Sequence, residues 1–262
     1  MTVTCTLNES ATTLNSLEQP VGLPVNDWKG CALPSRETMS GRYCELVALD
    51  PSEHGSDLFT AFSKDQEGRN WTYLPAGPFE QAEDFDTWLR AQCSAEDLLF
   101  FAIVDKRSAR AVGMASFMRM DLAQGVLEVG NIHFSPALQR TPLASEAMFL
   151  MMCRVFDELG YRRYEWKCDN CNEASKKAAR RLGFTFEGIF RQARVYKGRN
   201  RDTAWFSMLD SEWPAIKQAF QTWLEPANFD ETLQQIRRLE DCFVGGSKRR
   251  RYGVPSLHIG SL

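Results

Sequence analysis

The most constraining feature of this sequence is a strand that runs through a short turn into a long amphipathic helix. Residues 126–134 predict the strand. Residues 142–159 place apolar side chains three and four positions apart, which predicts a helix that Gly160 ends. Thr141 is a suitable N-cap, and Pro142 suits the first helical position, where its missing N–H costs nothing. This unit favours a fold in which helices pack on one main sheet.

Further predicted elements surround this unit. Residues 98–104 and 111–118 predict two strands that form an antiparallel meander with 126–134, because the turns between them are short. A strand over 164–168 is followed by a helix that Asn172 caps and Gly183 ends. Other strands are predicted over 44–49, 184–190, 191–196 and 203–209, and other helices over 57–62, 78–90 and 231–243 and around Trp213 to Trp223. We therefore expect an α+β fold with a single mixed, mostly antiparallel central sheet flanked by helices.

Composition shifts divide the chain into four parts. Residues 1–40 predict an irregular leader, and residues 41–225 form the main domain. Residues 226–244 predict a C-terminal helix, and residues 245–262 a basic, disordered tail that contains a Lys-Arg-Arg-Arg run.

Overall charge and hydropathy exclude several partners. Lysine and arginine number 31 against 34 acidic residues, which gives a net charge of -3 and no electrostatic footprint for nucleic acid. Apolar runs, such as residues 98–104, reach only seven residues, too few to span a bilayer. Residues 1–8 lack the basic and apolar regions of a secretory signal. We expect a soluble cytoplasmic protein that binds neither nucleic acid nor membrane.

Cysteine and histidine patterns argue against a metal site. The chain has eight cysteines, for which reduced thiols are expected without a secretory signal. Cys168 and Cys171 form a lone C-x-x-C without a nearby histidine or a second such pair, so buried thiols are favoured over zinc or redox chemistry. The chain also lacks a G-x-G-x-x-G, a P-loop and a G-x-S-x-G motif.

The turn before the long helix and the strand that leads to it carry the candidate chemistry. Unpaired N–H groups and the helix dipole make a helix N-terminus suited to phosphates, and Arg140 adds a charged donor. Glu128 is an acid within an otherwise apolar strand, and partial burial would suit it to act as a catalytic base. Pairing with a neighbouring arginine, or exposure to solvent, stays open as the alternative for Glu128.

These residues belong to a pattern that resembles the GCN5-related N-acetyltransferases (the GNAT superfamily), and within them the ribosomal-protein N-acetyltransferase-like branch. The cofactor loop of that family is Arg or Gln, two residues, Gly, one residue, then Gly or Ala ahead of a helix, and residues 139–144 match it in place. The branch's later motif, Asn-x-x-Ser with Leu-Gly-Phe downstream, matches Asn172, Ser175 and residues 182–184. The resemblance spans about residues 41–215.

The resemblance implies direct transfer of an acetyl group from acetyl-CoA, as acyl donor, to an amine in a ternary complex without a metal. It implies Glu128 and Ser175 as catalytic residues, with Ser175 near the thioester sulfur. The catalytic tyrosine of many members would fall near Ala179 and is missing, and Pro142 stands where the family has glycine. The expected cofactor-binding residues are Ile132, His133, Phe134, Gln139, Arg140, Thr141, Leu143, Ala144, Ser145, Asn172 and Ser175.

The acceptor site is the least constrained part of the prediction. Trp71, Tyr73 and Leu74 are expected to form one wall, with core packing as the alternative. Phe190, Arg191 and Arg194 are expected opposite, unless the arginines are solvated hairpin charges. We expect a small molecule or amino-acid-like amine as acceptor. The alternatives are a peptide N-terminus, as in the ribosomal-protein branch, and a non-catalytic acyl-CoA-binding module. A homodimer stays open.

Overall fold

The computed structural model describes residues 12–243, which fall into two units divided after Gly30. The first unit contains an exposed hairpin of β1 (Thr12–Leu14) and β2 (Pro20–Gly22). Asn15 shapes its turn, because the side-chain oxygen accepts hydrogen bonds from the N–H groups of Leu17 and Gln19. The irregular leader predicted for residues 1–40 is therefore wrong over this hairpin, and residues 1–11 lie outside the described part.

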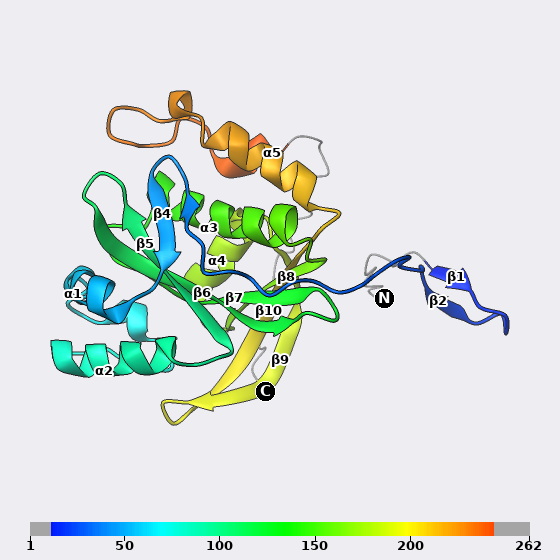
Figure 1. The fold of residues 1–262 in the computed structure, drawn as a ribbon, viewed down its shortest axis with the longest axis horizontal. Coiled ribbons are helices and arrows are strands. Elements are labelled where there is room, and N and C mark those ends of the chain that lie inside the picture. Colours follow the sequence, from blue (N-terminus) through cyan, green and yellow to red (C-terminus); the bar gives the residue numbers. More distant parts are fainter. Residues whose placement is uncertain (1–11, 244–262) are drawn as a thin grey trace, which may run out of the picture. The chain divides into compact units, whose positions relative to one another are not determined.

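The second unit is built on an eight-stranded sheet, which confirms the predicted fold class (Figure 1). The strand order is β3-β4-β5-β6-β7-β8-β10-β9, and all neighbours are antiparallel except the parallel pair β7–β8. The strands are β3 (Met39–Ser40), β4 (Cys44–Ala48), β5 (Leu98–Asp105), β6 (Arg110–Asp121), β7 (Val126–Phe134), β8 (Arg163–Asp169), β9 (Thr185–Tyr196) and β10 (Arg199–Leu209).

Helices cover both faces of this sheet (Figure 1). Successive residues of a strand point to opposite faces, so Phe100 packs with α1 and α2 while Phe101 packs with α3 and α5. The helices are α1 (Pro51–Phe62), α2 (Ala82–Cys93), α3 (Pro142–Cys153), α4 (Glu173–Arg181) and α5 (Trp213–Trp223), with a 3-10 turn η1 (Arg69–Trp71) and a π-helical turn η2 (Arg154–Glu158) that continues α3.

A buried carboxylate ties α3 to the edge of the sheet. Glu146 accepts hydrogen bonds from three successive backbone N–H groups, those of Arg42 at 2.7 Å, Tyr43 at 2.6 Å and Cys44 at 2.9 Å. Its exposed fraction is 4%. A Cβ on Gly41 would overlap this carboxyl group, so any other residue here would have to displace the carboxylate from its three donors.

The segment before β4 also belongs to the second unit. Residues 31–40 pack on it through Tyr161, whose hydroxyl donates to the Ala32 carbonyl at 3.0 Å, and through Arg154, which donates to Ser35 Oγ at 3.1 Å. The main body therefore begins ten residues before the predicted boundary at residue 41. These polar contacts give no periodic apolar pattern, so the sequence predicted an extended segment that packs on the body after about residue 20 but not where the body begins.

The two strands predicted over 184–190 and 191–196 are one strand, β9. It pairs with β10 across a two-residue turn in which Lys197 and Gly198 have φ of 48° and 69°. Positive φ at both positions is typical of the type I′ hairpin turn, which matches the twist of the strands that it joins.

The helix predicted over 231–243 is wrong. Residues 231–243 contain one 3-10 turn, η4 (Leu239–Cys242), and another, η3 (Pro226–Asn228), precedes them. Asp230 Oδ1 accepts from the N–H groups of Thr232 and Gln234, and the side chain of Asn228 bonds the backbone of Arg237. These side chains compete with helical hydrogen bonds, which explains the irregular path. Residues 244–262, with the predicted tail, lie outside the described residues.

Within residues 12–243, no helix is long and apolar enough to cross a membrane. The same residues contain no group of three histidine, cysteine or acidic side chains placed to hold a metal ion.

Candidate active site

The candidate site begins where two parallel strands separate. β7 pairs with β8 from Val126 to Val129 and not beyond, while β8 continues beside β10 alone to Asp169. The register of β7 against β6 shifts between Gly130 and His133, where Asn131 has φ of 50°. Such a bulge bends a strand away from its neighbour. The outer part of β7 therefore leaves backbone groups unpaired on the side that faces β8.

A cavity of about 1230 Å³ occupies this opening. Its lining runs from the first turn of α3 to the hairpin of β9 and β10, and it includes Ile132, His133 and Phe134 on β7. The volume exceeds the roughly 300–1,000 Å³ that is usual for small-ligand pockets. It suits an elongated ligand together with a second reactant.

The turn into α3 presents backbone donors to this cavity. Thr141 caps the helix by accepting from the N–H of Ala144 at 3.2 Å, as predicted, and Pro142 occupies the first turn. Arg140 has φ of 61°. Within residues 12–243, the backbone N–H groups of Arg140, Thr141 and Leu143 have no hydrogen-bond partner. The arrangement suits a phosphate despite the proline, because its flanking donors stay free.

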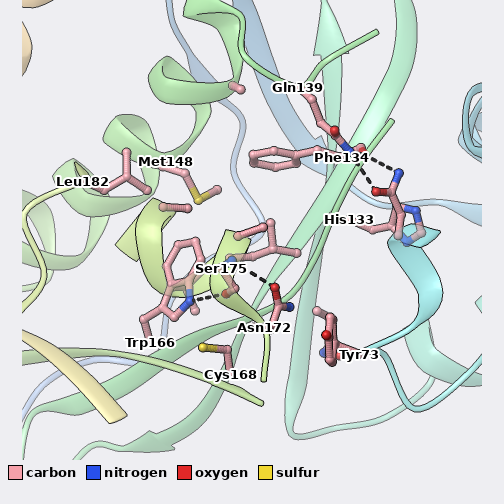
Figure 2. A pocket seen from close by; sticks show the side chains of 18 of the residues that line it. Tyr73, His133, Phe134, Gln139, Met148, Trp166, Cys168, Asn172, Ser175 and Leu182 are labelled. Carbon is pink, nitrogen blue, oxygen red and sulfur yellow. Dashed lines mark hydrogen bonds between the residues drawn. The ribbon is translucent and has the colours of Figure 1, made fainter. Parts of the chain in front are cut away.

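One residue of this loop does not line the cavity. Gln139, Arg140, Thr141, Ala144 and Ser145 line the cavity, and Leu143 does not. Gln139 is already engaged (Figure 2), because its amide donates to Asn70 Oδ1 and to the Phe134 carbonyl, each at 3.0 Å. Gln139 therefore holds the end of β7 against the loop at residue 70.

Ser175 and Asn172 meet at the start of α4, on the opposite side of the opening (Figure 2). Asn172 Oδ1 caps α4 by accepting from the N–H of Ser175 at 3.0 Å. Ser175 Oγ accepts from Trp166 Nε1 at 2.9 Å. An indole N–H only donates, so the Ser175 hydroxyl keeps its own hydrogen for another acceptor. Cys168 Sγ lies beside the Ser175 hydroxyl. Burial raises the pKa of Cys168, and the hydrogen bond from Ser175 offsets part of this rise.

Glu128 is buried and paired rather than solvated. Its Oε2 lies 2.7 Å from an Arg119 nitrogen and 2.8 Å from Lys167 Nζ. Lys167 Nζ also lies 2.6 Å from Glu165 Oε2 and 3.7 Å from the centre of the Trp205 ring. Glu128, Lys167 and Arg119 all line the cavity. The arginine pairing that the sequence left open is therefore present, and Lys167 is a second partner that sequence reasoning missed.

His133 turns its ring away from polar groups. The ring centroid lies 3.9 Å from that of Phe62 and 4.1 Å from that of Trp71, and neither ring nitrogen has a hydrogen-bond partner among the described residues. Burial lowers the pKa of His133 to about 3. The negative charge of Asp65 acts in the opposite direction and is the smaller effect. Only the backbone of His133 can serve an elongated ligand.

Acidification should therefore destabilise the fold through His133. Its folded pKa of about 3 lies below the ordinary value of 6.5, so the neutral ring stabilises the fold above pH 6.5 and this contribution falls as pH decreases toward 3. We expect a loss of about 2 kcal/mol between pH 7 and pH 5, measured by urea unfolding. His133→Phe should lack this part of the loss. An unchanged pH dependence in that variant would contradict the assignment.

The predicted acceptor walls are partly wrong. Tyr73 and Leu74 line the cavity, and the Tyr73 hydroxyl reaches the Cys171 carbonyl at 3.2 Å. Trp71 instead lies in the core between α1, α2 and β7, with an exposed fraction of 4%. Phe190 and Arg191 lie outside the cavity, and Phe190 stacks on Trp205 with the ring centroids 4.3 Å apart.

Residues near the hairpin turn line the cavity instead. Arg194, which the sequence also predicted for this wall, is one of them, and Val195, Tyr196 and Arg201 lie a few positions beyond the predicted residues. The two-residue turn at Lys197 and Gly198 places this part of the hairpin over the opening. Lys197 Nζ donates a hydrogen bond to the Trp71 carbonyl at 2.8 Å. The basic residues of 191–201 were a signal for this wall, but the position of the turn was not evident.

The C-terminal segment also contributes. Trp223, Phe229, Leu233, Gln234 and Gln235 line the cavity. Trp223 Nε1 donates to Gln235 Oε1 at 2.9 Å, which ties this segment to the end of α5. No pattern in the sequence indicated these residues.

Comparison with known proteins identifies the architecture. Residues 45–185 match the family model described as an acetyltransferase (GNAT) domain. The crystal structure of a GCN5-related N-acetyltransferase from Brucella melitensis is 49% identical, with a TM-score of 0.81, over 83% of this chain and 99% of that one. A probable GNAT-family acetyltransferase from Chromobacterium violaceum is 44% identical, with a TM-score of 0.70, over 75% and 98%. A Bacillus licheniformis relative, named uncharacterized N-acetyltransferase p20, is 30% identical over 183 residues, 67% of this chain and 99% of its own length.

Proposed function

This chain belongs to the GNAT family of acetyltransferases, and from this premise we propose that it transfers an acetyl group from acetyl-CoA to the primary amine of a small, amino-acid-like acceptor. The observation that carries the proposal is the single cavity surface that joins free N–H groups at α3 to Ser175 and Glu128. A donor with phosphates at one end and a reactive group at the other suits this surface.

The separated strands support binding of the donor arm. Residues Ile132 to Phe134 of β7 lie along the opening where β8 no longer pairs with them. Their unpaired backbone groups can bond an extended amide-bearing chain in the way a neighbouring strand would. The N–H groups of Arg140 and Thr141 and the Arg140 guanidinium would hold the diphosphate. When bound, acetyl-CoA supplies an acetyl group activated as a thioester.

The residues between the strands support the transfer itself. The acceptor ammonium must first lose a proton, for which we assign Glu128 as the base, because its carboxylate lines the cavity in a fixed position. The amine nitrogen then bonds to the acetyl carbon as the carbon–sulfur bond breaks. The thiolate takes a proton, which we assign to the hydroxyl of Ser175. On acylation the nitrogen loses its second proton, which restores the Ser175 hydroxyl. The products are an acetamide, free CoA and the first proton on Glu128, which returns to solvent.

Charge reversal in the α3 turn tests the donor site. Arg140→Glu should raise the KM for acetyl-CoA about 20-fold, because a carboxylate replaces a charged donor beside the diphosphate. CoA release can be followed with a thiol reagent across a panel of amines. Arg107→Glu is the matched control, since this exposed arginine lies in the turn between β5 and β6, outside the cavity. An Arg140→Glu variant with the parent KM, or purified protein that binds no CoA by calorimetry, would refute the donor site.

The same panel separates the two acceptor classes. Transfer to free amino acids or small amines supports the proposal. Transfer confined to peptides with a free N-terminus would favour the ribosomal-protein type of acceptor instead.

A further inference from the structure

Two arginines of the β9–β10 hairpin line the cavity without an acidic partner among the described residues, as do Arg140 at the α3 turn and Arg181 on α4. Arg194 on β9 and Arg201 on β10 lie directly opposite each other in the hairpin, and both line the cavity. No carboxylate within residues 12–243 is within ion-pair distance of either guanidinium. In contrast, Arg119, Arg163 and Lys167 of the neighbouring network are each paired with a glutamate. The hairpin therefore brings uncompensated positive charge to one end of the cavity.

Arg201 is the more enclosed of the two. It is half-buried, burial lowers its pKa, and its Nε is buried without a hydrogen-bond partner in the described part of the chain. Asp169 is the acid whose charge acts on it most, but both Asp169 oxygens are in use. One accepts from the Cys171 N–H and the other from the Tyr196 hydroxyl, each at 2.7 Å. A half-buried guanidinium without an ion-pair partner is costly, which points to an anionic ligand.

The position of Arg201 relates this charge to the reacting groups. Arg201 interacts electrostatically with Asp169 and Cys168 of β8, and Cys168 lies beside Ser175. Lys167, which holds Glu128, is only two residues from Asp169, about 7 Å along a strand. The free N–H groups assigned to the donor diphosphate belong to the turn into α3, a different element. The arginine pair is therefore close enough to Glu128 for one small molecule to contact both. It is separate from the turn into α3 that we assign to the diphosphate.

We propose that the acceptor carries a carboxylate, which binds Arg201 and Arg194 while its amine faces Glu128. The chemical class is an amino acid or a close relative with a free carboxylate. This inference rests on the proposed acetyl transfer and narrows its acceptor. Arg201 supplies the main contact because it is the more buried, and the exposed Arg194 adds a weaker, solvent-screened one.

The experiment compares each L-amino acid with the amine that lacks its carboxylate, using CoA release to obtain kcat and KM. The parent enzyme should prefer the amino acid of the best pair by about 30-fold in kcat/KM, the range expected for a hydrogen-bonded charge. Arg201→Gln should raise the KM for that amino acid by about the same factor, with little change for the paired amine. Its KM for acetyl-CoA should stay within twofold of the parent value. Arg199→Gln, an exposed arginine of the same hairpin outside the cavity, is the matched control.

Each contrary result has a distinct meaning. Equal use of both members of every active pair would overturn the carboxylate site while leaving acetyl transfer intact. A rise in the acetyl-CoA KM of Arg201→Gln would assign the arginines to a donor phosphate instead. If no amine in the panel releases CoA, calorimetric titration of the amino acids into the CoA complex decides. Binding that Arg201→Gln abolishes supports the site without turnover, and no binding overturns it.

Discussion

Replacing Glu146 with alanine is expected to lower the free energy of unfolding by about 4 kcal/mol, because three backbone donors lose a buried carboxylate as their acceptor. The donors belong to consecutive residues, Arg42 to Cys44, and no other hydrogen bond of these N–H groups is present within residues 12–243. The same carboxylate joins the start of β4 to α3, so the loss should also loosen the helix whose first turn faces the cavity. Urea unfolding at neutral pH measures the change.

Two further variants make this result specific. Glu146→Gln keeps one acceptor oxygen but adds donors facing donors, so we expect an intermediate loss of about 2–3 kcal/mol. Glu96→Ala removes an exposed glutamate from the turn before β5 and should change stability by less than about 0.5 kcal/mol. A Glu146→Ala protein as stable as Glu96→Ala would show that the three N–H groups find other acceptors at no cost.

Replacing Lys167 with methionine should lower kcat at least about 100-fold and stability by about 3 kcal/mol. The side chain is only 6% exposed and holds Glu128 and Glu165 on one nitrogen. Without it the two buried carboxylates repel each other, and Glu128 loses the contact that fixes it toward the cavity. Arg119 and Arg163 would still hold one carboxylate each, so we expect the fold to persist. Steady-state CoA release and urea unfolding measure the two effects separately.

A double variant separates positioning from simple damage. In Lys167→Met with Glu165→Gln, one negative charge is removed with the positive one, so most of the stability should return. Turnover should stay low, at the level of Glu128→Gln, because the base is still not held. Recovery of both stability and turnover would show that Lys167 only balances charge and that Glu128 needs no positioning.

Local sequence patterns predicted the structure correctly wherever it depends on contacts between residues that are close in the sequence. The strand and helix on either side of Thr141, the proline at the helix start and the Asn172 cap all depend on contacts within four residues, and the structure contains each of them. Most residues of the predicted cofactor loop, and Ser175, line the cavity, because these positions follow directly from the elements that carry them.

Residues that depend on distant partners were placed less well. Trp71 is in the core because α1, α2 and β7 enclose it, which no local pattern shows. Lys167 gave no signal either, since an alternating charged residue in a strand is equally typical of a solvated face. The C-terminal helix failed because Asn228 and Asp230 bond backbone groups several residues away.

What the amino-acid order alone determined is most of the elements of the main body, their sequence along the chain and the family to which they belong, since helix caps, turns and apolar periodicity act over a few residues. Tertiary structure alone decided where β7 and β8 part, which cations neutralise Glu128 and which arginines remain without an acid. The physical reason is that burial and charge pairing depend on which strands become neighbours, and β8 meets β10 across some forty residues of chain.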